Sequence, residues 1–271
     1  MSWVRGICLA VDLFQVGFPL SLSLSLSLAY LILMRLQNHL GGIWWDKAHT
    51  QKATASNAGP VIAALQLYEH LKDSSYSTFA LRVYNYWFDN MVNKANYQVC
   101  DHINPNGEKV WWVFSYNEGL MLGASVEMYR LTKNTTYLNI AQKIVDFIRT
   151  AETILDTKYG TVLFDGSGCS GDCNEFKGIT FRYLTEFYKL QTELNLTGDR
   201  DSLAFLQSNV NALWNLARNS NNLFATNWLG PPLAIGQSCY QSQQNSAVMA
   251  LNLFVVAVNK IWSFLVPCCC M

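Results

Sequence analysis

The same order of hydrophobic and polar positions occurs twice in the middle of the chain, in two segments about sixty residues apart. Each segment opens with an Asn-x-Gly triplet, continues as an apolar stretch at helical spacing, and reaches a short polar turn between two tyrosines. A second amphipathic stretch follows the turn in both. The matching positions are Asn57, Tyr68 and Tyr76 in the first segment and Asn117, Tyr129 and Tyr137 in the second. The pattern predicts one helix–turn–helix unit present twice.

Two further segments continue the repeat. A third copy spans residues 176–214 with its turn at Gly198, and a fourth begins around Gln244 and runs to Trp262. Helical hairpins repeated at this interval bury their apolar faces on one another. We therefore expect an all-α array of helical hairpins.

The first forty residues follow a different pattern. Residues 13–34 carry no charge and are long enough to span a bilayer, and Arg5 ahead of them is typical of a signal peptide or signal anchor. Within that stretch, residues 21–28 alternate strictly between Ser and Leu, which is the period of a strand and also what a translated dinucleotide repeat encodes. Two interpretations stay open: a segment that contacts a membrane through residues 13–34, or an artefact of the gene model.

These patterns divide the chain into three parts. Residues 1–40 form the hydrophobic N-terminal segment, residues 41–265 the array of hairpins, and residues 266–271 a cysteine-rich tail. The Cys-Cys-Cys-Met run in the tail raises the same question of a gene-model artefact.

Composition narrows the classes of function. Hydrophobic residues make up 51% of the 271 positions, which is enough for the core of one domain or at most two. The formal net charge is zero, so electrostatics gives no support for a nucleic-acid partner. Aromatic residues make up 13% of the chain. Two explanations fit them: bulky packing between helices, or rings on which the CH-rich faces of sugars stack.

Cysteines and glycosylation sequons bear on the compartment. Cys169 and Cys173 lie in a glycine-rich loop without a matching His or second Cys pair nearby. We therefore expect no metal and no other cofactor, and either a local disulfide or two free thiols. Sequons begin at Asn134 and Asn195, both in predicted hairpin turns where the acceptor side chain is exposed. They favour an extracellular or cell-surface location.

Polar residues gather where the first helix of each predicted hairpin begins, as in the motif SYNEG at residues 115–119. In a ring of hairpins, these helix N-termini lie at one rim, where N–H groups and side chains face a ligand. One interpretation is plain helix capping by Asn and Ser. The other is a rim of donors and acceptors for a polyhydroxylated ligand, with stacking faces from Trp44, Trp45, Trp111 and Trp112.

Four motifs give this array a family resemblance. They are GGIWWDKAHTQKATASN, FSYNEGLMLGASVEMYRLT, CSGDCNEFKGITFRYL and QSQQNSAVMAL. From Trp45 to about Leu251 the chain resembles glycoside hydrolase family 76, whose members degrade α-1,6-mannan. The resemblance implies an (α/α)6 toroid, here incomplete, because six hairpins need about 350 residues and this chain holds three and a half to four. The missing hairpins are expected chiefly before Gly41.

The resemblance also implies a mechanism that this sequence does not support. A retaining glycosidase needs two carboxyl groups about 5–5.5 Å apart. Family members supply them from adjacent aspartates upstream of the Gly-Gly-x-x-Trp segment, and no two acidic residues are adjacent anywhere in this chain. Glu118, where the family has Gln, is a weak candidate for a surrogate catalytic acid. We expect impaired catalysis.

What carries over is a set of sugar-binding and rim-shaping positions. For Asp101, binding of sugar hydroxyls and bracing of its loop both remain open, as do a buried ion pair and ligand contact for Arg182. The implied partner is α-mannan or another mannose-containing glycan, either hydrolysed or, in a non-catalytic remnant or membrane-anchored fragment, only bound. The implied residues are Trp45, Asn57, Asp101, Tyr116, Asn117, Lys177 and Arg182.

Overall fold

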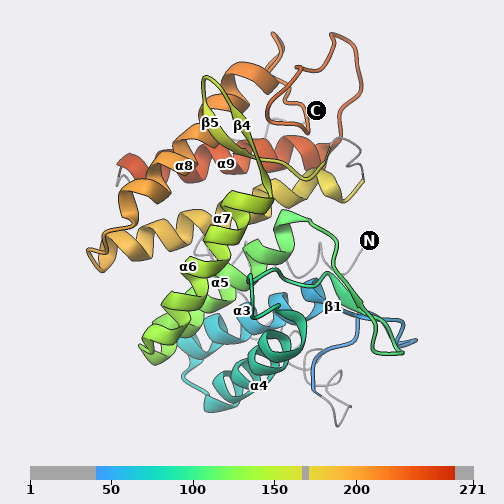
Figure 1. Cartoon of the computed structure of the whole chain (residues 1–271), viewed down its shortest axis with the longest axis vertical. Helices are drawn as coiled ribbons and strands as arrows, with labels where there is room; N and C mark the ends of the chain where they lie inside the picture. The colour runs from blue at the N-terminus through green and yellow to red at the C-terminus, as the bar shows by residue number, and fades with distance from the viewer. Residues whose placement is uncertain (1–40, 167–170, 260–271) are drawn as a thin grey trace. The chain divides into compact units, whose positions relative to one another are not determined.

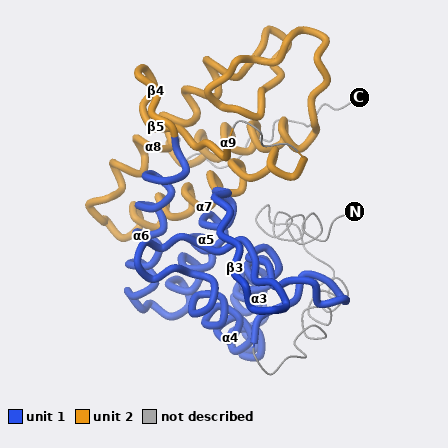
Figure 2. The backbone as a smooth tube through the Cα atoms, turned by 45° about the vertical axis from the view of Figure 1, so that its right-hand side comes forward, with its two compact units in different colours: residues 1–153 blue, residues 154–271 orange. Residues whose placement is uncertain are grey.

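The computed structural model describes residues 41–166 and 171–259 of the chain. The chain divides into two compact units, residues 1–153 and residues 154–271, which are described separately (Figure 2). The predicted N-terminal segment 1–40, including residues 13–34, and the tail 266–271 lie outside the described residues. The predicted boundaries of these parts stay predictions.

The first unit is built from two helical hairpins (Figure 1). Helix α3 (Thr54–Leu71) and helix α4 (Ser74–Met91) form the first, and helix α5 (Ser115–Thr132) and helix α6 (Thr135–Ala151) form the second. Helix α3 also packs on helix α5, so the two hairpins share one core. The predicted repeat of a helix–turn–helix unit is therefore confirmed for this pair.

The two hairpin turns are chemically alike. Lys72 and Lys133 end their helices in the left-handed conformation, and each donates its backbone N–H to the carbonyl of a tyrosine, Tyr68 or Tyr129. The next residue then caps the second helix: in the first turn, the Asp73 carboxylate accepts from the backbone N–H of Ser75. In the second turn the equivalent contact joins Asn134 and the backbone N–H of Thr136.

A small antiparallel sheet, which the helical pattern did not predict, covers the start of α3. It consists of β1 (Lys52–Ala53), β2 (His102–Ile103) and β3 (Lys109–Val110), in the order β1-β2-β3. Ala53 pairs with His102, and His102 pairs with Val110. Strands of two residues leave too little alternation to be read from a sequence.

Buried aromatic side chains tie together the helices of the first unit. Tyr84 of α4 is 1% exposed, its hydroxyl bonds the Ser125 hydroxyl of α5 at 2.9 Å, and its ring meets Tyr137 of α6 edge-on. Trp87, also in α4, is fully buried and donates its indole N–H to Thr54 at 3.1 Å. Burial of rings this large contributes about 1.5–3 kcal/mol each, provided their polar atoms find partners as they do here.

The second unit holds a strand hairpin and three long helices. Strands β4 (Thr153–Asp156) and β5 (Gly160–Leu163) pair with each other. Helix α7 (Cys173–Glu193) packs on α8 (Asp199–Ala212) and α9 (Gln241–Asn259), and α8 continues into the π-helical turn η1 (Leu213–Ala217). The third predicted hairpin corresponds to α7 and α8, and the fourth begins as predicted with a helix, α9.

Gly178 lets α7 and α9 pack closely. A Cβ at this position would lie 2.9 Å from the Ser246 Cα and 2.6 Å from the Ser246 hydroxyl. Any larger residue would therefore push the two helices apart. The close approach of α7 and α9 therefore requires a glycine at position 178.

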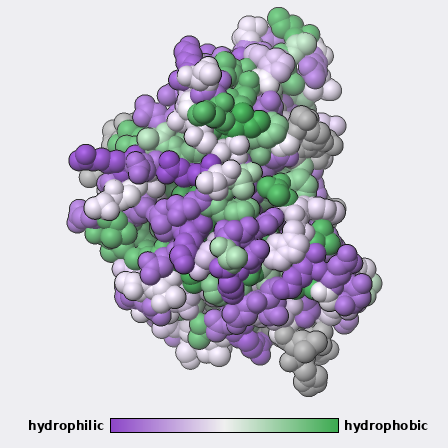
Figure 3. All heavy atoms as spheres, in the orientation of Figure 1, coloured by the Kyte–Doolittle hydropathy of each residue, from purple (hydrophilic) through white to green (hydrophobic). Residues whose placement is uncertain are grey.

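The surface mixes residue types. Hydrophilic and hydrophobic side chains are interspersed on the face drawn in Figure 3, as the zero net charge and the scattered exposed apolar residues indicate. Within the described residues, no helix combines the length and apolar character that a membrane span requires.

Candidate functional site

Asp101 lies at the centre of a polar network in the first unit. Two backbone hydrogen bonds hold it in place: its carbonyl accepts from the Thr54 N–H at 2.8 Å, and its own N–H donates to the Val110 carbonyl at 2.9 Å. The small sheet and the start of α3 therefore fix this residue from both sides. Asp101 is 6% exposed, so its carboxylate must be satisfied by protein donors or by a ligand.

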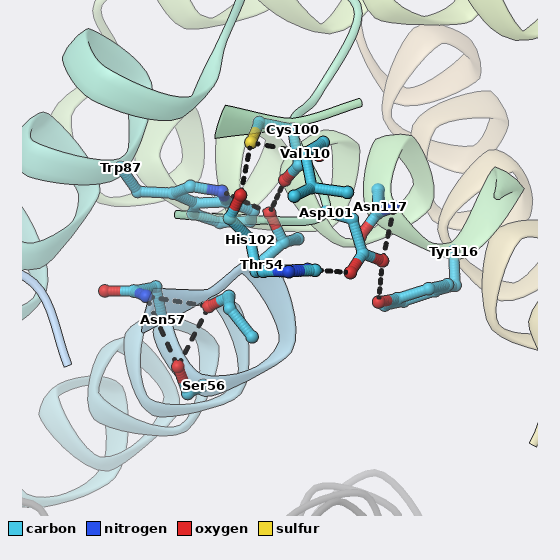
Figure 4. A network of polar contacts seen from close by, with 11 residues as sticks. Thr54, Ser56, Asn57, Trp87, Cys100, Asp101, His102, Val110, Tyr116 and Asn117 are labelled. Atoms are coloured by element: carbon cyan, nitrogen blue, oxygen red, sulfur yellow. Dashed lines mark hydrogen bonds and ion pairs between the residues drawn. The ribbon is translucent and has the colours of Figure 1, made fainter. Parts of the chain in front are cut away.

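Three side chains meet the Asp101 carboxylate (Figure 4). The His102 Nδ1 lies 2.7 Å from Oδ2, while the Tyr116 hydroxyl donates to Oδ1 at 2.6 Å and the Asn117 amide donates to Oδ1 at 3.2 Å. Tyr116 and Asn117 come from the first turn of α5. The structure thus brings together three of the residues implied by the resemblance, and it adds His102 to them.

Asn57 braces the chain ahead of α3. It is fully buried, its Oδ1 accepts from the Ile43 N–H at 2.8 Å, and its Nδ2 donates to the Ala53 carbonyl at 2.8 Å. The neighbouring Ser56 hydroxyl donates to the Ile43 carbonyl at 2.9 Å. Asn57 thereby fixes the segment that carries Trp45. The backbone N–H of Trp45 donates to the Gln51 carbonyl. These contacts give Asn57 a structural role, in which it fixes the chain ahead of α3.

Glu118 is 1% exposed, and its Oε1 accepts from the Val99 N–H at 2.6 Å. The contact holds the loop that leads to Asp101. This is a structural use of the carboxyl group, and a catalytic role for Glu118 stays a prediction.

Lys177 and Arg182 belong to α7 in the second unit. The Lys177 ammonium lies 3.5 Å from the Asp165 carboxylate, and both side chains are buried. Burial lowers the pKa of Lys177, and the charge of Asp165 opposes that shift. Arg182 is half-buried and places its Nη2 3.1 Å from the Met249 sulfur of α9.

Lys52 is a buried cation that is not among the residues implied by the family resemblance. Its ammonium donates to the Gly41 carbonyl at 2.7 Å and lies 4.8 Å and 4.7 Å from the ring centroids of Trp44 and Tyr86. Burial lowers its pKa. Trp44 also stacks on His49, so its ring has partners inside the protein. A Lys two residues before a helix carries no sequence signal for such an aromatic enclosure.

The structure gives the bonding state of three cysteines. Cys173, at the start of α7, is disulfide-bonded. Cys100 and Cys239 are free. Cys169 lies outside the described residues, so the predicted pairing within the glycine-rich loop stays a prediction.

Stacked helical hairpins with polar side chains clustered at a helix N-terminus define an all-α protein of the repeat type, with its candidate site at the start of α5. Within that class the chain belongs to glycosyl hydrolase family 76, whose sequence model matches residues 22–262. A comparison with functionally curated proteins found no match.

Solved structures agree with this assignment. The Lin0763 protein of Listeria innocua is 25% identical, with a TM-score of 0.75 over 88% of this chain and 66% of its own. The GH76A α-1,6-mannanase of Salegentibacter sp. HEL1_6 is 29% identical, with a TM-score of 0.69 over 80% of this chain and 63% of its own. The chain thus spans just under two thirds of the length of these two structures.

An inactive variant of the same mannanase has been solved with α-1,6-mannotetrose, and two successive aspartates are replaced in it. It is 27% identical, with a TM-score of 0.75 over 94% of this chain and 72% of its own. Together with the helical elements, these likenesses confirm the predicted fold class, an all-α fold of helical hairpins of the α/α toroid type.

Proposed function

We propose that this chain binds α-1,6-linked mannan and that its hydrolytic activity is impaired. The observation that carries the proposal is the network around Asp101, in which the family motif SYNEG supplies Tyr116 and Asn117 to one buried carboxylate. The α-1,6-mannanase that this chain resembles binds α-1,6-mannooligosaccharides, which supports the same class of ligand here.

The case for impaired hydrolysis rests on the acidic residues. The mannanase variants with two successive aspartates replaced are inactive, and this chain contains no two adjacent acidic residues. In the first unit, Asp101 and Glu118 are both committed to hydrogen bonds within the protein. A retaining mechanism needs a nucleophile and an acid/base about 5–5.5 Å apart, whereas each of these two carboxylates already accepts hydrogen bonds from the protein.

Hydrolysis of mannan is the second candidate function, favoured by family membership and by the similarity to the Salegentibacter α-1,6-mannanase. Titration calorimetry with α-1,6-mannotetraose and a reducing-end assay on α-1,6-mannan separate the two, using the full chain. An active family 76 mannanase serves as the positive control and an α-1,4-glucan as the control polymer. We expect binding of mannotetraose without released sugars.

Each other outcome has a definite meaning. Release of mannooligosaccharides would contradict the impairment and establish a hydrolase. Absence of both binding and release would contradict the proposal as a whole. Binding of the α-1,4-glucan with equal affinity would contradict the assignment to mannan.

An extracellular or cell-surface location is part of the same proposal. Asn134 and Asn195, the two sequon asparagines, are both exposed in turns between helices, which supports their access to a glycosyltransferase. Expression through a eukaryotic secretory pathway should give a chain whose mass falls on treatment with an endoglycosidase. An unchanged mass for the secreted chain would contradict the use of these sites.

A further inference from the structure

Trp112 is an exposed aromatic side chain next to the buried Asp101 network. It follows β3, and it is 54% exposed. Its ring meets His102 edge-on at a centroid distance of 5.2 Å and Phe114 edge-on at 5.9 Å. Two rings at steep angles to the indole, 74° for His102 and 68° for Phe114, therefore contact it, while about half of the Trp112 surface stays open to solvent. A large aromatic ring held in this way is suited to stacking against a ligand.

His102 links this ring to Asp101. Its Nδ1 lies 2.7 Å from the Asp101 Oδ2, and its side chain is 9% exposed. An ionised carboxylate only accepts hydrogen bonds, so Nδ1 carries the proton in this pair. In the neutral imidazole, Nε2 is then an acceptor. Within the described residues, no hydrogen bond occupies Nε2.

The carboxylate itself is held from its other side. Tyr116 and Asn117 both donate to Oδ1, which leaves Oδ2 for His102. The imidazole is thus locked in one tautomer and one orientation by residues that are themselves fixed to α5. Because the imidazole is already held in place, it loses little conformational entropy when a ligand hydroxyl binds to it.

We propose that His102 and Trp112 form a pyranoside subsite, in which a sugar stacks its apolar face on the Trp112 indole and donates a hydroxyl hydrogen bond to the His102 Nε2. Asp101 acts as a positioning residue that holds the imidazole. The combination matches a pyranose, which presents CH groups on one face and hydroxyl groups at its edge. The proposal deepens the proposed function and rests on it for the choice of mannose as the sugar.

Two replacements separate the roles of the imidazole nitrogens. In His102→Asn the side-chain amide nitrogen takes the place of Nδ1 and keeps the bond to Asp101, while the group at the Nε2 position is lost. In His102→Gln the amide reaches toward the Nε2 position and the bond to Asp101 is weakened. Trp112→Ala removes the stacking face, and Trp112→Phe keeps part of it. Trp214→Ala is the matched control, because Trp214 is also a surface tryptophan, 45% exposed, and belongs to the second unit.

The experiment measures affinity for α-1,6-mannotriose by calorimetry, and Tm by scanning calorimetry, for the full chain and each variant. We expect Trp112→Ala and His102→Asn each to weaken binding by about tenfold or more at an unchanged Tm, with partial recovery in Trp112→Phe. Trp214→Ala should bind as the wild type does. In NMR spectra, methyl α-mannoside should shift the Trp112 indole N–H and the His102 ring signals.

The outcomes distinguish this inference from the function on which it rests. Mannotriose binding that survives unchanged in both Trp112→Ala and His102→Asn would overturn the subsite and leave the proposed function standing. The wild-type chain could fail to bind mannotriose and still show the Trp112 and His102 shifts with another methyl pyranoside. That result would overturn mannan as the ligand and support the subsite. Absence of these shifts with every pyranoside would overturn the subsite whatever happens to mannan.

Discussion

Glu118 in α5 occupies the position that Asn57 occupies in α3. Each is the fourth residue of an 18-residue helix, and each accepts a hydrogen bond from a backbone N–H in the segment ahead of its own helix, Val99 for Glu118 and Ile43 for Asn57. Both side chains are almost fully buried. The two hairpins therefore use the same position to fix the chain that leads into them.

This equivalence predicts how Glu118 responds to substitution. Glu118→Gln keeps an acceptor for the Val99 N–H, so we expect a loss of at most about 1.5 kcal/mol in the free energy of unfolding. Glu118→Ala leaves that buried N–H without a partner and should cost about 1–3 kcal/mol. Urea denaturation measures both values. A Glu118→Gln variant of normal stability that loses mannan turnover would instead show a catalytic role.

The buried pair of Lys177 and Asp165 predicts a strong coupling. Lys177→Met leaves the Asp165 carboxylate buried without its cation and should cost about 3–5 kcal/mol of stability. Adding Asp165→Asn removes the stranded charge and should restore part of that loss. A double-mutant cycle with Asp165→Asn alone as the third corner should give a coupling of about 0.5–3 kcal/mol. Simple additivity in this cycle would show that the pair does not interact.

The burial of Cys100 predicts a thiol that reacts slowly and a free energy of unfolding that depends on pH. It is 0% exposed, and burial raises the pKa of its thiol from 9.0 to about 11. Above pH 9 the unfolded chain loses this proton while the folded chain keeps it, so stability should fall as the pH rises from about 9 to 11. Cys100→Ser should remove that part of the pH dependence in urea titrations.

Alkylation tests the same residue directly. With iodoacetamide at pH 8, we expect mass spectrometry to find modification at Cys239, which is half-buried and free, and none at Cys100 until the chain unfolds. Equal labelling of both residues in the folded protein would contradict the burial of Cys100.

Substitution of Gly178 tests how much stability is lost when α7 and α9 move apart. Gly178→Ala places a methyl group 2.9 Å from the Ser246 Cα, and we expect a loss of about 1–3 kcal/mol. Ser246→Ala removes the hydroxyl at 2.6 Å but leaves the backbone in place. The double variant should therefore recover only part of the loss, which thermal unfolding can measure. A neutral Gly178→Ala would mean that these helices shift at little cost.

Some of the site could be predicted from the sequence, and some could not. The motif SYNEG contains Tyr116 and Asn117, and the family resemblance implies Asp101 in the loop ahead of that motif. The sequence pattern pairs Asn57 with Asn117 through their shared Asn-x-Gly triplets. The structure pairs Asn57 with Glu118 instead, because the helices begin at Thr54 and Ser115 and their lengths set the register.

The repeated hairpins could be predicted from the sequence, because the helical period, the polar turn and its caps are local properties of each segment. Lys72 and Lys133 end their helices in the same way, and each is followed by a residue that caps the next helix. Three contacts could be seen only in the folded chain: His102 with Asp101, Lys52 with the rings of Trp44 and Tyr86, and Lys177 with Asp165. These contacts depend on which buried polar groups the packing of distant segments brings within hydrogen-bonding or ionic range, and no local period records that.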